Sequence, residues 1–294
     1  MKKILNKSYR LIRAQYDNVI NLKSKIKRKE RNSKELGITH TNYDGKEIII
    51  SLTTIPERLD NLMQTLDSLM EQSLKPNKII LYIYKEQFKN IEIDEILEEF
   101  VKKGLEIKKV SEDLRAHKKY YYSFQEFPND LIITVDDDIL YSKRMVELLY
   151  KGYRKYPNCV ICMRAHGIKY SRNGFEKYWD WDYEVVGKRI PSIDLLATGG
   201  AGTLYVPKQF SNEVFNRKNI INLALSADDL WLKAMQILNN QKVAKVTPLK
   251  GSVTVITGSQ DVALVNENVY NNNNDIILAK LEKEYGLIQK LISH

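Results

Sequence analysis

The segment LIITVDDDILYS, residues 131–142, places three adjacent aspartates directly after a run of apolar residues. The five residues LIITV favour a buried strand, and Asp136, Asp137 and Asp138 follow at its end. Adjacent carboxylates repel one another, and removing them from water costs free energy unless a positive group lies among them. The segment therefore predicts a buried strand whose carboxyl end forms a site for a cation.

Strands and helices are expected to alternate on either side of this segment. Strands are predicted at residues 47–55, 78–84, 105–110, 131–135 and 160–166, and helices at 57–73, 93–104, 116–127 and 142–156, the last with Ser142 as its N-cap. A chain that alternates in this way forms right-handed crossovers and a mostly parallel sheet covered by helices on both faces. The expected fold class is α/β, and its ligands bind beyond the carboxyl ends of the strands.

Asp136 and Asp138 are the predicted metal ligands. Alternate side chains of an extended segment point to the same side, so these two carboxylates can converge on one ion while Asp137 points elsewhere. Two hard oxygen ligands with open remaining positions suit Mg²⁺ or Mn²⁺ that also holds substrate phosphates. The alternative is an acidic strand end that caps a neighbouring helix or pairs with lysines.

The composition is ordinary for a folded protein. The 294 residues are 43% hydrophobic and 28% charged, enough for one large domain or two small ones. No apolar run is long enough for a transmembrane helix, and the N-terminus lacks the pattern of a signal peptide. The two cysteines, Cys159 and Cys162, exclude a disulfide framework and are expected to be buried thiols. A reducing, cytoplasmic setting is therefore expected.

The positive charge is concentrated in residues 1–36, here called the basic arm. The basic arm holds 12 Lys and Arg and 3 Asp and Glu, which accounts for the whole net charge of +9. Apolar residues recur every three or four positions from Leu5 to Ile26, which predicts an amphipathic helix. Such a helix is typical of contact with an anionic membrane surface. Packing on its own domain and formation of a homodimer are the alternatives. Because the rest of the chain is neutral, no nucleic-acid partner is expected.

Four motifs follow one another along the chain: IIISLTTIPERL (48–59), TVDDDI (134–139), LLATGGAGTLYVP (195–207) and SADDLWL (226–232). Together they resemble the GT-A glycosyltransferases, which use nucleotide-sugar donors. In that family they are similar to the first strand with its donor loop, the Asp-x-Asp metal motif, the glycine-rich turn beside the acceptor, and the acidic start of the catalytic helix. The resemblance spans about residues 47–240 and points to bacterial family 2-like enzymes of capsule and lipopolysaccharide synthesis.

The resemblance implies a role for each motif. Asp138 would be the main protein ligand of a metal that bridges the donor diphosphate, and Asp136 would contact the metal or the donor ribose. Asp229 would be the catalytic base, with Asp228 beside it near the acceptor. The residues expected against the donor nucleotide are Thr53, Pro56, Arg58 and Asp137. A cation can neutralise the leaving diphosphate and a carboxylate can accept the proton of the acceptor hydroxyl, so the chemistry agrees. The alternative for Asp228 and Asp229 is that they only cap a helix.

Further residues are candidates for contacts with the two substrates. Lys118 and Lys119, in RAHKKYYYSF, are predicted to neutralise the diphosphate. Trp179 and Trp181, in KYWDWDY, would lie on one side of an extended segment and offer the acceptor sugar an aromatic platform. Packing against the sheet is the alternative for both tryptophans. Gly200 allows the backbone to approach the acceptor closely.

Three regions are expected: the basic arm and a linker (1–45), a GT-A domain (46–265), and a polar linker with a C-terminal helix near 276–292 (266–294). Many enzymes of this fold take a third metal ligand, often a histidine, from the C-terminal region. After His166 this chain has only His294, so Asp261 or water could take that place, and a solvated turn is the favoured interpretation of Asp261. His166 itself is a weaker candidate for the site.

The residues and the resemblance together predict a metal-dependent glycosyltransferase. It would move a sugar from a nucleoside diphosphate, with UDP favoured, to a saccharide or lipid-linked saccharide at the cytoplasmic face of a bacterial membrane. Inversion is favoured because Asp229 offers a base for a single displacement. Two rivals are a sugar nucleotidyltransferase and a non-catalytic module that binds membrane or nucleic acid. The first would need a glycine-rich phosphate loop, and SLTTIPERL contains no glycine.

Overall fold

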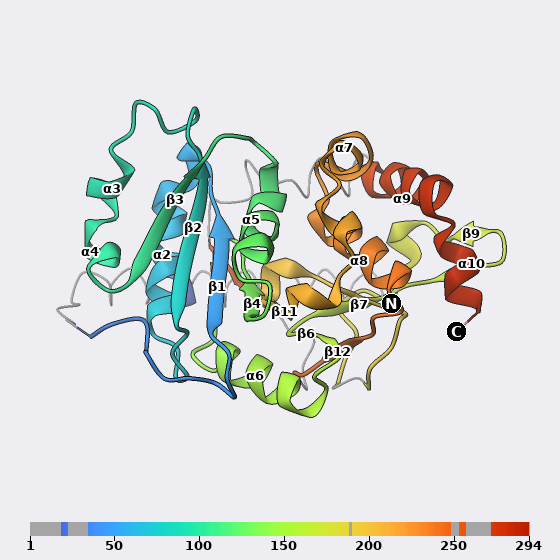
Figure 1. The fold of residues 1–294 in the computed structure, drawn as a ribbon, viewed down its shortest axis with the longest axis horizontal. Coiled ribbons are helices and arrows are strands. Elements are labelled where there is room, and N and C mark those ends of the chain that lie inside the picture. The colour runs from blue at the N-terminus through green and yellow to red at the C-terminus, as the bar shows by residue number, and fades with distance from the viewer. Residues whose placement is uncertain (1–18, 23–34, 188–189, 248–252, 257–271, 294) are drawn as a thin grey trace.

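A seven-stranded sheet forms the centre of the molecule (Figure 1). The computed structural model describes residues 19–22, 35–187, 190–247, 253–256 and 272–293. In this sheet β11 runs antiparallel to its two neighbours, and every other pairing is parallel. From edge to edge the strands are β12 (Val243–Lys245), β6 (Val160–Cys162), β11 (Thr203–Tyr205), β4 (Leu131–Thr134), β1 (Ile48–Thr53), β2 (Lys78–Tyr84) and β3 (Leu105–Val110). The expected α/β class with a mostly parallel sheet is confirmed.

The central strands send alternate side chains into two separate cores. Ile49 and Ile132 belong to the core on one face, whereas Ile48, Ile50 and Ile133 belong to the core on the other. All five side chains are fully buried. A strand buried on both faces has no polar side to present to water, which explains why these segments are continuous apolar runs rather than alternating ones.

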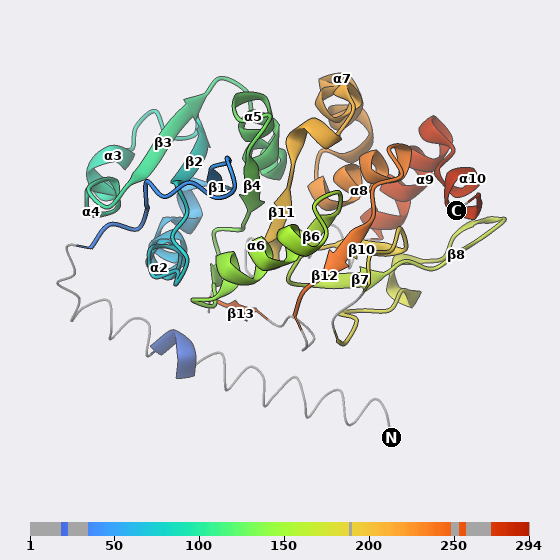
Figure 2. The same ribbon diagram turned by 60° about the horizontal axis from the view of Figure 1, so that its bottom comes forward.

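Helices cover both faces of the sheet (Figures 1 and 2). The face beneath Ile50 is covered by α2 (Leu59–Met70), α3 (Ile93–Ile96), α4 (Glu98–Val101) and α6 (Met145–Lys155). The opposite face is covered by α5 (Lys118–Glu126) and α8 (Asp228–Leu238). Both α5 and α8 begin near the carboxyl ends of the parallel strands, so their first turns reach the edge where ligands bind in such sheets.

The first half of the chain follows the predicted elements, with local differences. The predicted helix at 57–73 is a 3-10 turn η1 (Pro56–Arg58) followed by α2, and the one at 116–127 is η2 (Arg115–His117) followed by α5. The prediction that Ser142 caps a helix is wrong, because α6 has Arg144 as its N-cap without a side-chain cap bond. The Ser142 hydroxyl instead accepts a bond from the Arg144 N–H at 3.3 Å.

The second half of the chain departs further from the predictions. The strand expected at 160–166 is two strands, β6 and β7 (Ala165–Gly167), and β7 pairs with β10 (Leu195–Ala197) outside the main sheet. Two more small sheets pair β5 (Ile139–Leu140) with β13 (Thr254–Val255) and β8 (Tyr170–Ser171) with β9 (Gly174–Phe175). Short helical turns fill the connections: η3 (Tyr178–Asp180), η4 (Gly199–Ala201), η5 (Pro207–Gln209), η6 (Asn212–Phe215), α7 (Arg217–Asn219) and η7 (Ile220–Ala224).

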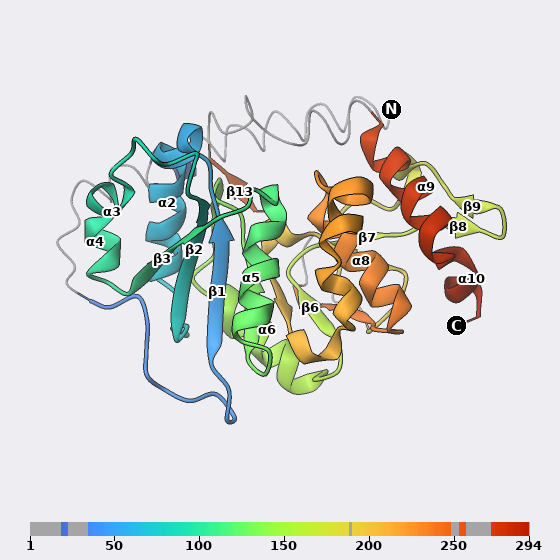
Figure 3. The ribbon, with the colours of Figure 1, turned by 45° about the horizontal axis from the view of Figure 1, so that its top comes forward.

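The C-terminal region folds onto the same core as α8 (Figure 3). The helix expected near 276–292 is two helices, α9 (Asn273–Tyr285) and α10 (Leu287–Ile292), and Gly286 between them has φ +60°. Leu281 and Leu291 are buried in the core cluster that contains Trp231 of α8. These helices therefore pack against α8 and η7 of the same fold.

Little of the basic arm lies among the described residues. Residues 19–22 form one helical turn, and the buried side chain of Asn21 donates a hydrogen bond to the Val255 carbonyl at 3.0 Å. None of the helices within the described residues has the length and apolar character needed to cross a bilayer. Membrane contact by the basic arm, a homodimer and the three predicted regions stay predictions.

Candidate active site

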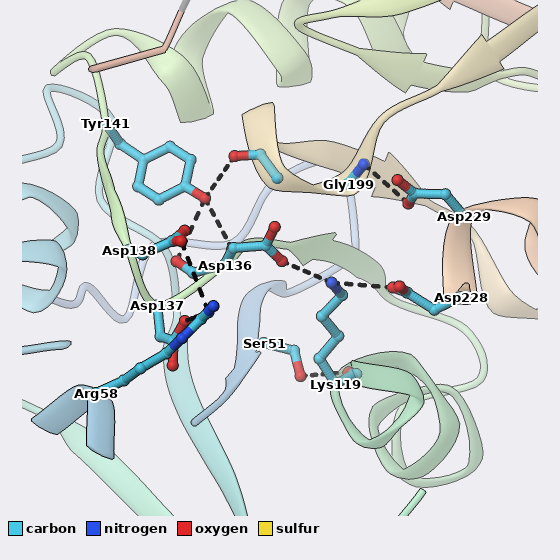
Figure 4. A network of polar contacts seen from close by, with 11 residues as sticks. Ser51, Arg58, Lys119, Asp136, Asp137, Asp138, Tyr141, Gly199, Asp228 and Asp229 are labelled. Carbon is cyan, nitrogen blue, oxygen red and sulfur yellow. Dashed lines mark hydrogen bonds and ion pairs between the residues drawn. The ribbon is translucent and has the colours of Figure 1, made fainter. Parts of the chain in front are cut away.

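A cavity of about 680 Å³ lies at the carboxyl ends of the parallel strands. The loop after β1 contributes one wall, the aspartates after β4 form the floor, and the first residues of α5 and α8 close the far side (Figure 4). Its lining includes most of the predicted site: Thr53, Arg58, Lys118, Lys119, Asp136, Asp137, Asp138, Gly200, Asp228 and Asp229. The fold thus gathers residues from four sequence motifs into one cavity.

Asp137 is fixed by contacts within the protein. Its Oδ2 accepts a bond from the Thr54 hydroxyl at 2.6 Å, and its Oδ1 accepts one from Nη1 of Arg58 at 2.8 Å. The residue is only 4% exposed. Burial raises the pKa of Asp137, although Arg58 and Thr54 oppose that shift. As predicted, Asp137 points away from Asp136. Both of its carboxylate oxygens accept hydrogen bonds within the protein. Asp137 therefore supports Arg58, rather than binding the donor nucleotide as predicted.

Asp136 and Asp138 present their carboxylates to the cavity. The Asp136 side chain is 38% exposed, and Asp138 Oδ2 lies 3.6 Å from Nη1 of Arg58. The hydroxyl of Tyr141 holds the backbone here, since it accepts a bond from the Asp136 N–H at 2.8 Å and donates one to the Gly200 carbonyl at 2.9 Å. The strand end and the glycine turn are therefore joined by one tyrosine.

The two glycines of this turn make room for carboxylates. A Cβ on Gly200 would lie 2.5 Å from Asp136 Oδ2, and a Cβ on Gly199 would lie 2.9 Å from Asp229 Oδ1. Real Cβ atoms do not approach other atoms at such distances, so any side chain here would displace an aspartate. Gly200 thus permits a close approach, but the group that approaches it is the carboxylate of Asp136, and its contact with the acceptor stays a prediction.

Asp228 and Asp229 occupy the first turn of α8. The N-cap of this helix is Ala227, and no side chain caps it, so neither aspartate is a helix cap. Asp229 Oδ1 accepts a bond from the Gly199 N–H at 2.9 Å, and Asp228 Oδ2 lies 2.9 Å from Nζ of Lys119. Both aspartates line the cavity across from Asp136.

The two neighbouring aspartates have opposite pKa shifts. Burial raises the pKa of Asp229 to about 7, and the charge of Asp228 adds to that effect. Burial would also raise the pKa of Asp228, but the nearby cation of Lys119 outweighs it, so that pKa is lowered. The pKa of Asp229 thus lies near neutral pH, whereas that of Asp228 lies below its ordinary value. A carboxylate with a pKa near the working pH is suited to accept a proton.

The two predicted phosphate-binding lysines line the cavity, and both are paired. Lys118 is 1% exposed, and its Nζ bonds Asp113. The Lys119 side chain is 4% exposed, and its Nζ bonds Asp136 Oδ1 at 2.7 Å as well as Asp228. Burial disfavours the charge on Lys119, but the carboxylates of Asp136, Asp228 and Asp229 outweigh it and hold its pKa well above the usual value. Lys119 is therefore a permanent cation among carboxylates.

The predicted aromatic platform is partly wrong. Residues 178–180 form the turn η3 rather than an extended segment, so the two tryptophans point in different directions. Trp181 is 4% exposed and donates to the Glu176 carbonyl at 3.0 Å, which buries it in the core. Trp179 is 46% exposed and stacks on Tyr183, with ring centroids 6.0 Å apart. Neither tryptophan nor Pro56 is among the residues that line the cavity.

Some residues of the site gave no recognisable signal in the sequence. Arg164 lies in a short connection and Asn274 comes from the first turn of α9, and long-range folding brings both to the cavity. Tyr141 does not line the cavity but supports it through its bonds to Asp136 and Gly200. His166 does not line it: its Nδ1 accepts a bond from the Glu184 N–H, and burial lowers its pKa to about 3. Asp261 lies outside the described residues.

The carboxylate oxygens of the cavity fit a divalent cation whose other ligands come mainly from the substrate. Among the described residues, no three or more His, Cys, Asp or Glu side chains are grouped to hold a metal. The protein can therefore offer Asp136 and Asp138, and a diphosphate and water would supply the other oxygens, as Mg²⁺ and Mn²⁺ commonly require. Aspartates outnumber Lys and Arg by one among the described residues that line the cavity. Because a diphosphate would add further negative charge, it would bind favourably only together with a cation.

Comparisons with known proteins find solved structures of low similarity. The sequence matches no protein-family model and no curated protein. Among solved structures, it is similar to S. aureus TarS 1–349, alone (TM-score 0.43, 10% identity) and in complex with UDP (TM-score 0.44, 12% identity). Each match covers 68% of this chain and 57% of TarS 1–349.

A third similar structure covers more of the chain. It is the mannosyltransferase PcManGT from Pyrobaculum calidifontis, in complex with GDP-Man and Mn²⁺. The TM-score is 0.47 at 10% identity, and the match covers 99% of this chain and 84% of PcManGT. At this level of similarity, the function of this chain has to be argued from its own cavity.

Proposed function

We propose that this protein is a metal-dependent glycosyltransferase of GT-A architecture that takes its sugar from a nucleoside-diphosphate donor. The observation that carries the proposal is the cavity itself. It brings Asp136 and Asp138, which line it after β4, opposite a second pair of carboxylates at the start of α8, within about 680 Å³. That volume lies in the range of small-molecule sites. One pair suits a metal-bound diphosphate, and the other suits an acceptor hydroxyl.

The donor would lie against the loop after β1 and the aspartates after β4. Asp136 and Asp138 would hold the ion, which neutralises charge on the leaving diphosphate when it is bound. Arg58 lies between Asp137 and Asp138, so its guanidinium is fixed at the edge of the same region. Thr53 lines the cavity from the end of β1, where a nucleotide would pack. UDP is the donor nucleotide we favour.

The acceptor would lie against α8. Asp229 Oδ1 is held by the Gly199 N–H, which leaves Oδ2 to take the proton of the acceptor hydroxyl. Its raised pKa lets it hold that proton after transfer. A base on the face opposite the leaving group suits a single displacement, so we favour inversion. The acceptor class is a saccharide or a lipid-linked saccharide, and Trp179 with Tyr183 offers an exposed aromatic surface for further sugars.

We propose that the basic arm determines where the reaction takes place. Its 12 Lys and Arg against 3 acidic residues would bind anionic lipid, each at about 1 kcal/mol. The enzyme would then work at the cytoplasmic face of a bacterial membrane, in capsule or lipopolysaccharide synthesis. Deletion of residues 1–36 is expected to abolish flotation with anionic vesicles while soluble turnover stays. Flotation of the truncated protein equal to that of the full chain would exclude this role of the arm.

A donor screen tests the proposed function. The protein is incubated with UDP-, GDP-, CMP- and dTDP-sugars, with Mn²⁺ or with EDTA, and release of free nucleotide is measured. Slow release from one donor, dependent on Mn²⁺ and lost in Asp138→Ala, is the expected result. Calorimetry with Mn²⁺ and each nucleotide covers the case in which an acceptor is required for turnover. Absence of both release and Mn²⁺-dependent binding would refute the proposal.

A further inference from the structure

Lys119 connects the two acidic sides of the cavity. Its Nζ bonds Asp136 Oδ1 at 2.7 Å on the strand side and Asp228 Oδ2 at 2.9 Å on the α8 side (Figure 4). Asp136 follows β4 and Asp228 begins α8, nearly a hundred residues later. The Lys119 side chain is 4% exposed, so water competes little for these bonds. Within the drawn network, this lysine is the direct link between the two carboxylate groups.

The backbone of Lys119 is itself fixed to the sheet. The hydroxyl of Ser51, in the middle of β1, donates to the Lys119 carbonyl. Ser123, one turn further along α5, donates to the same carbonyl at 2.6 Å. Both serines are fully buried. These two bonds hold the main chain of Lys119 in place. They therefore limit where Nζ can lie, and with it the carboxylates that it contacts.

We propose that Lys119 is a positioning residue that fixes Asp136 and Asp228 relative to each other. This inference rests on the proposed function and deepens it: the lysine aligns the donor side of the site with the acceptor side, and it does not serve as a phosphate ligand. Its charge is already matched by two carboxylates at bonding distance. Reacting groups must be aligned closely for transfer, and a displacement of about 1 Å can cost about 100-fold in rate.

Three variants test the proposal by turnover. Lys119→Met keeps most of the side-chain length without the charge, and Lys119→Arg keeps the charge. The matched control is Lys245→Met, which removes another buried lysine, one that donates to the Thr247 and Gly187 carbonyls and does not line the cavity. Turnover is counted per molecule that binds nucleotide, which removes losses due to unfolding.

Lys119→Met is expected to lower kcat by about 100-fold, while the donor KM changes by less than about tenfold. Lys119→Arg is expected to recover part of that loss, and Lys245→Met is expected to keep wild-type kcat per binding molecule. If Lys119→Met loses no more kcat than the control, the positioning role is refuted. A rise in donor KM with unchanged kcat would refute it too, since that result marks a phosphate ligand.

A thermal measurement tests the link without any turnover. With Lys119 present, Asp136→Asn and Asp228→Asn each remove a partner of a buried cation, so each is expected to lower Tm. In Lys119→Met protein, the same substitutions relieve uncompensated negative charge and are expected to raise Tm. If the two Asn substitutions change Tm in the same direction in wild-type and in Lys119→Met protein, the link through Lys119 is refuted. Failure of the proposed function alone would appear as wild-type protein without Mn²⁺-dependent nucleotide binding, with the change of sign in Tm preserved.

Discussion

The two acidic clusters of the cavity differ in how their charge is compensated. In the cluster after β4, Asp136 pairs with Lys119, and Asp137 pairs with Arg58, which also lies 3.6 Å from Asp138. In the cluster at the start of α8, the bond to Lys119 goes to Asp228, whereas Asp229 has the Gly199 N–H. In the first cluster two cations thus lie beside three carboxylates, with Arg58 shared by Asp137 and Asp138, whereas in the second cluster the ion pair is made by one carboxylate of two.

That difference separates binding from proton transfer. A metal binds the charged form of a carboxylate, and a neighbouring cation favours that form. Asp229 is buried beside Asp228, and these two effects outweigh the opposing charge of Lys119, so its pKa is raised to about 7 and suits proton exchange. The neighbours Asp228 and Asp229 therefore have pKa values that their surroundings shift in opposite directions.

Asp229→Asn is expected to have the largest effect on turnover. An amide cannot accept the proton, so kcat should fall by about 1,000-fold, within the usual range for loss of a general base. Mn²⁺-dependent nucleotide binding should be unchanged, because the first cluster stays intact. Single-turnover assays measure the loss of turnover, and calorimetry measures Mn²⁺-dependent nucleotide binding. Weakened nucleotide binding would mean that the clusters do not divide the work in this way.

The same variant should be more stable than wild type at alkaline pH. The pKa of Asp229 in the folded protein is raised from its ordinary value of 3.8 to about 7, so stability is lost as the pH rises between these two values and stays lost above them. A neutral amide avoids that cost, and Tm at pH 8 should therefore rise. Below pH 3.8 the carboxyl is mostly protonated in the folded and the unfolded chain alike, and the difference in Tm should vanish there.

Asp138→Asn should weaken binding of the nucleotide, whereas Asp137→Asn should lower the stability of the fold. Asp138→Asn is expected to keep its fold and to weaken Mn²⁺-dependent nucleotide binding by about 100-fold, the upper end for loss around a metal site. Asp137→Asn leaves the Arg58 guanidinium without its nearest buried partner and is expected to destabilise the protein by about 3 kcal/mol. Calorimetry and denaturant unfolding separate them. Equal losses of stability would contradict the assignment of Asp137 as a support.

The paired variants Gly200→Ala and Gly199→Ala should each disturb one cluster. The new Cβ of the first would displace Asp136, and that of the second would displace Asp229. We expect roughly tenfold weaker donor binding from Gly200→Ala and roughly tenfold lower kcat from Gly199→Ala, less than the loss for a 1 Å misplacement. Each variant serves as the control for the other. An identical pattern of KM and kcat in both would show that the turn responds as one unit.

The smallest expected effect is a shift in the pH profile. Asp229 can accept a proton only in its ionised form, so kcat/KM should fall as the pH drops below about 7. Asp228→Asn removes the neighbouring negative charge, so the pKa of Asp229 should fall and the acidic limb should move to lower pH by about one unit. The charged groups that face Asp229 are Lys119, Asp136 and Asp228. An unmoved limb would assign the titration to another group.

The elements of the first half were predictable because their sequence is locally decisive. The bounds predicted for β2 and β3 match the structure residue for residue. The strand β2 is an almost continuous apolar run buried on both faces, and β3 carries Leu105, Ile107 and Val110 among charged residues and follows the helix breaker Gly104. The acidic motifs were also visible, because three adjacent carboxylates after an apolar strand require a chemical reason. The partners that distinguish them, Lys119 and Gly199, depend on tertiary contacts.

The second half was less predictable because its strands change sheets. The run VICMRAH continues without a turn residue, yet Met163 and Arg164 separate β6 in the main sheet from β7 in the small one. The orientation of Trp181 could not be inferred, since the turn η3 replaces the extended segment that would have aligned it with Trp179. No local pattern marks Tyr141 or Asn274 as part of a site. Their roles arise only when distant segments meet.

One wall of the cavity comes from segments that follow α8 along the chain. The N–H of Ile256 donates to the carbonyl of Asp138 at 2.8 Å, β13 pairs with β5, and Val253, Val255 and Asn274 line the cavity. During synthesis, both acidic clusters emerge before this wall exists. A chain released before residue 253 would therefore carry the full set of aspartates and still lack part of the cavity. The order of residues along the chain thus delays assembly of the site until the surrounding fold is nearly finished.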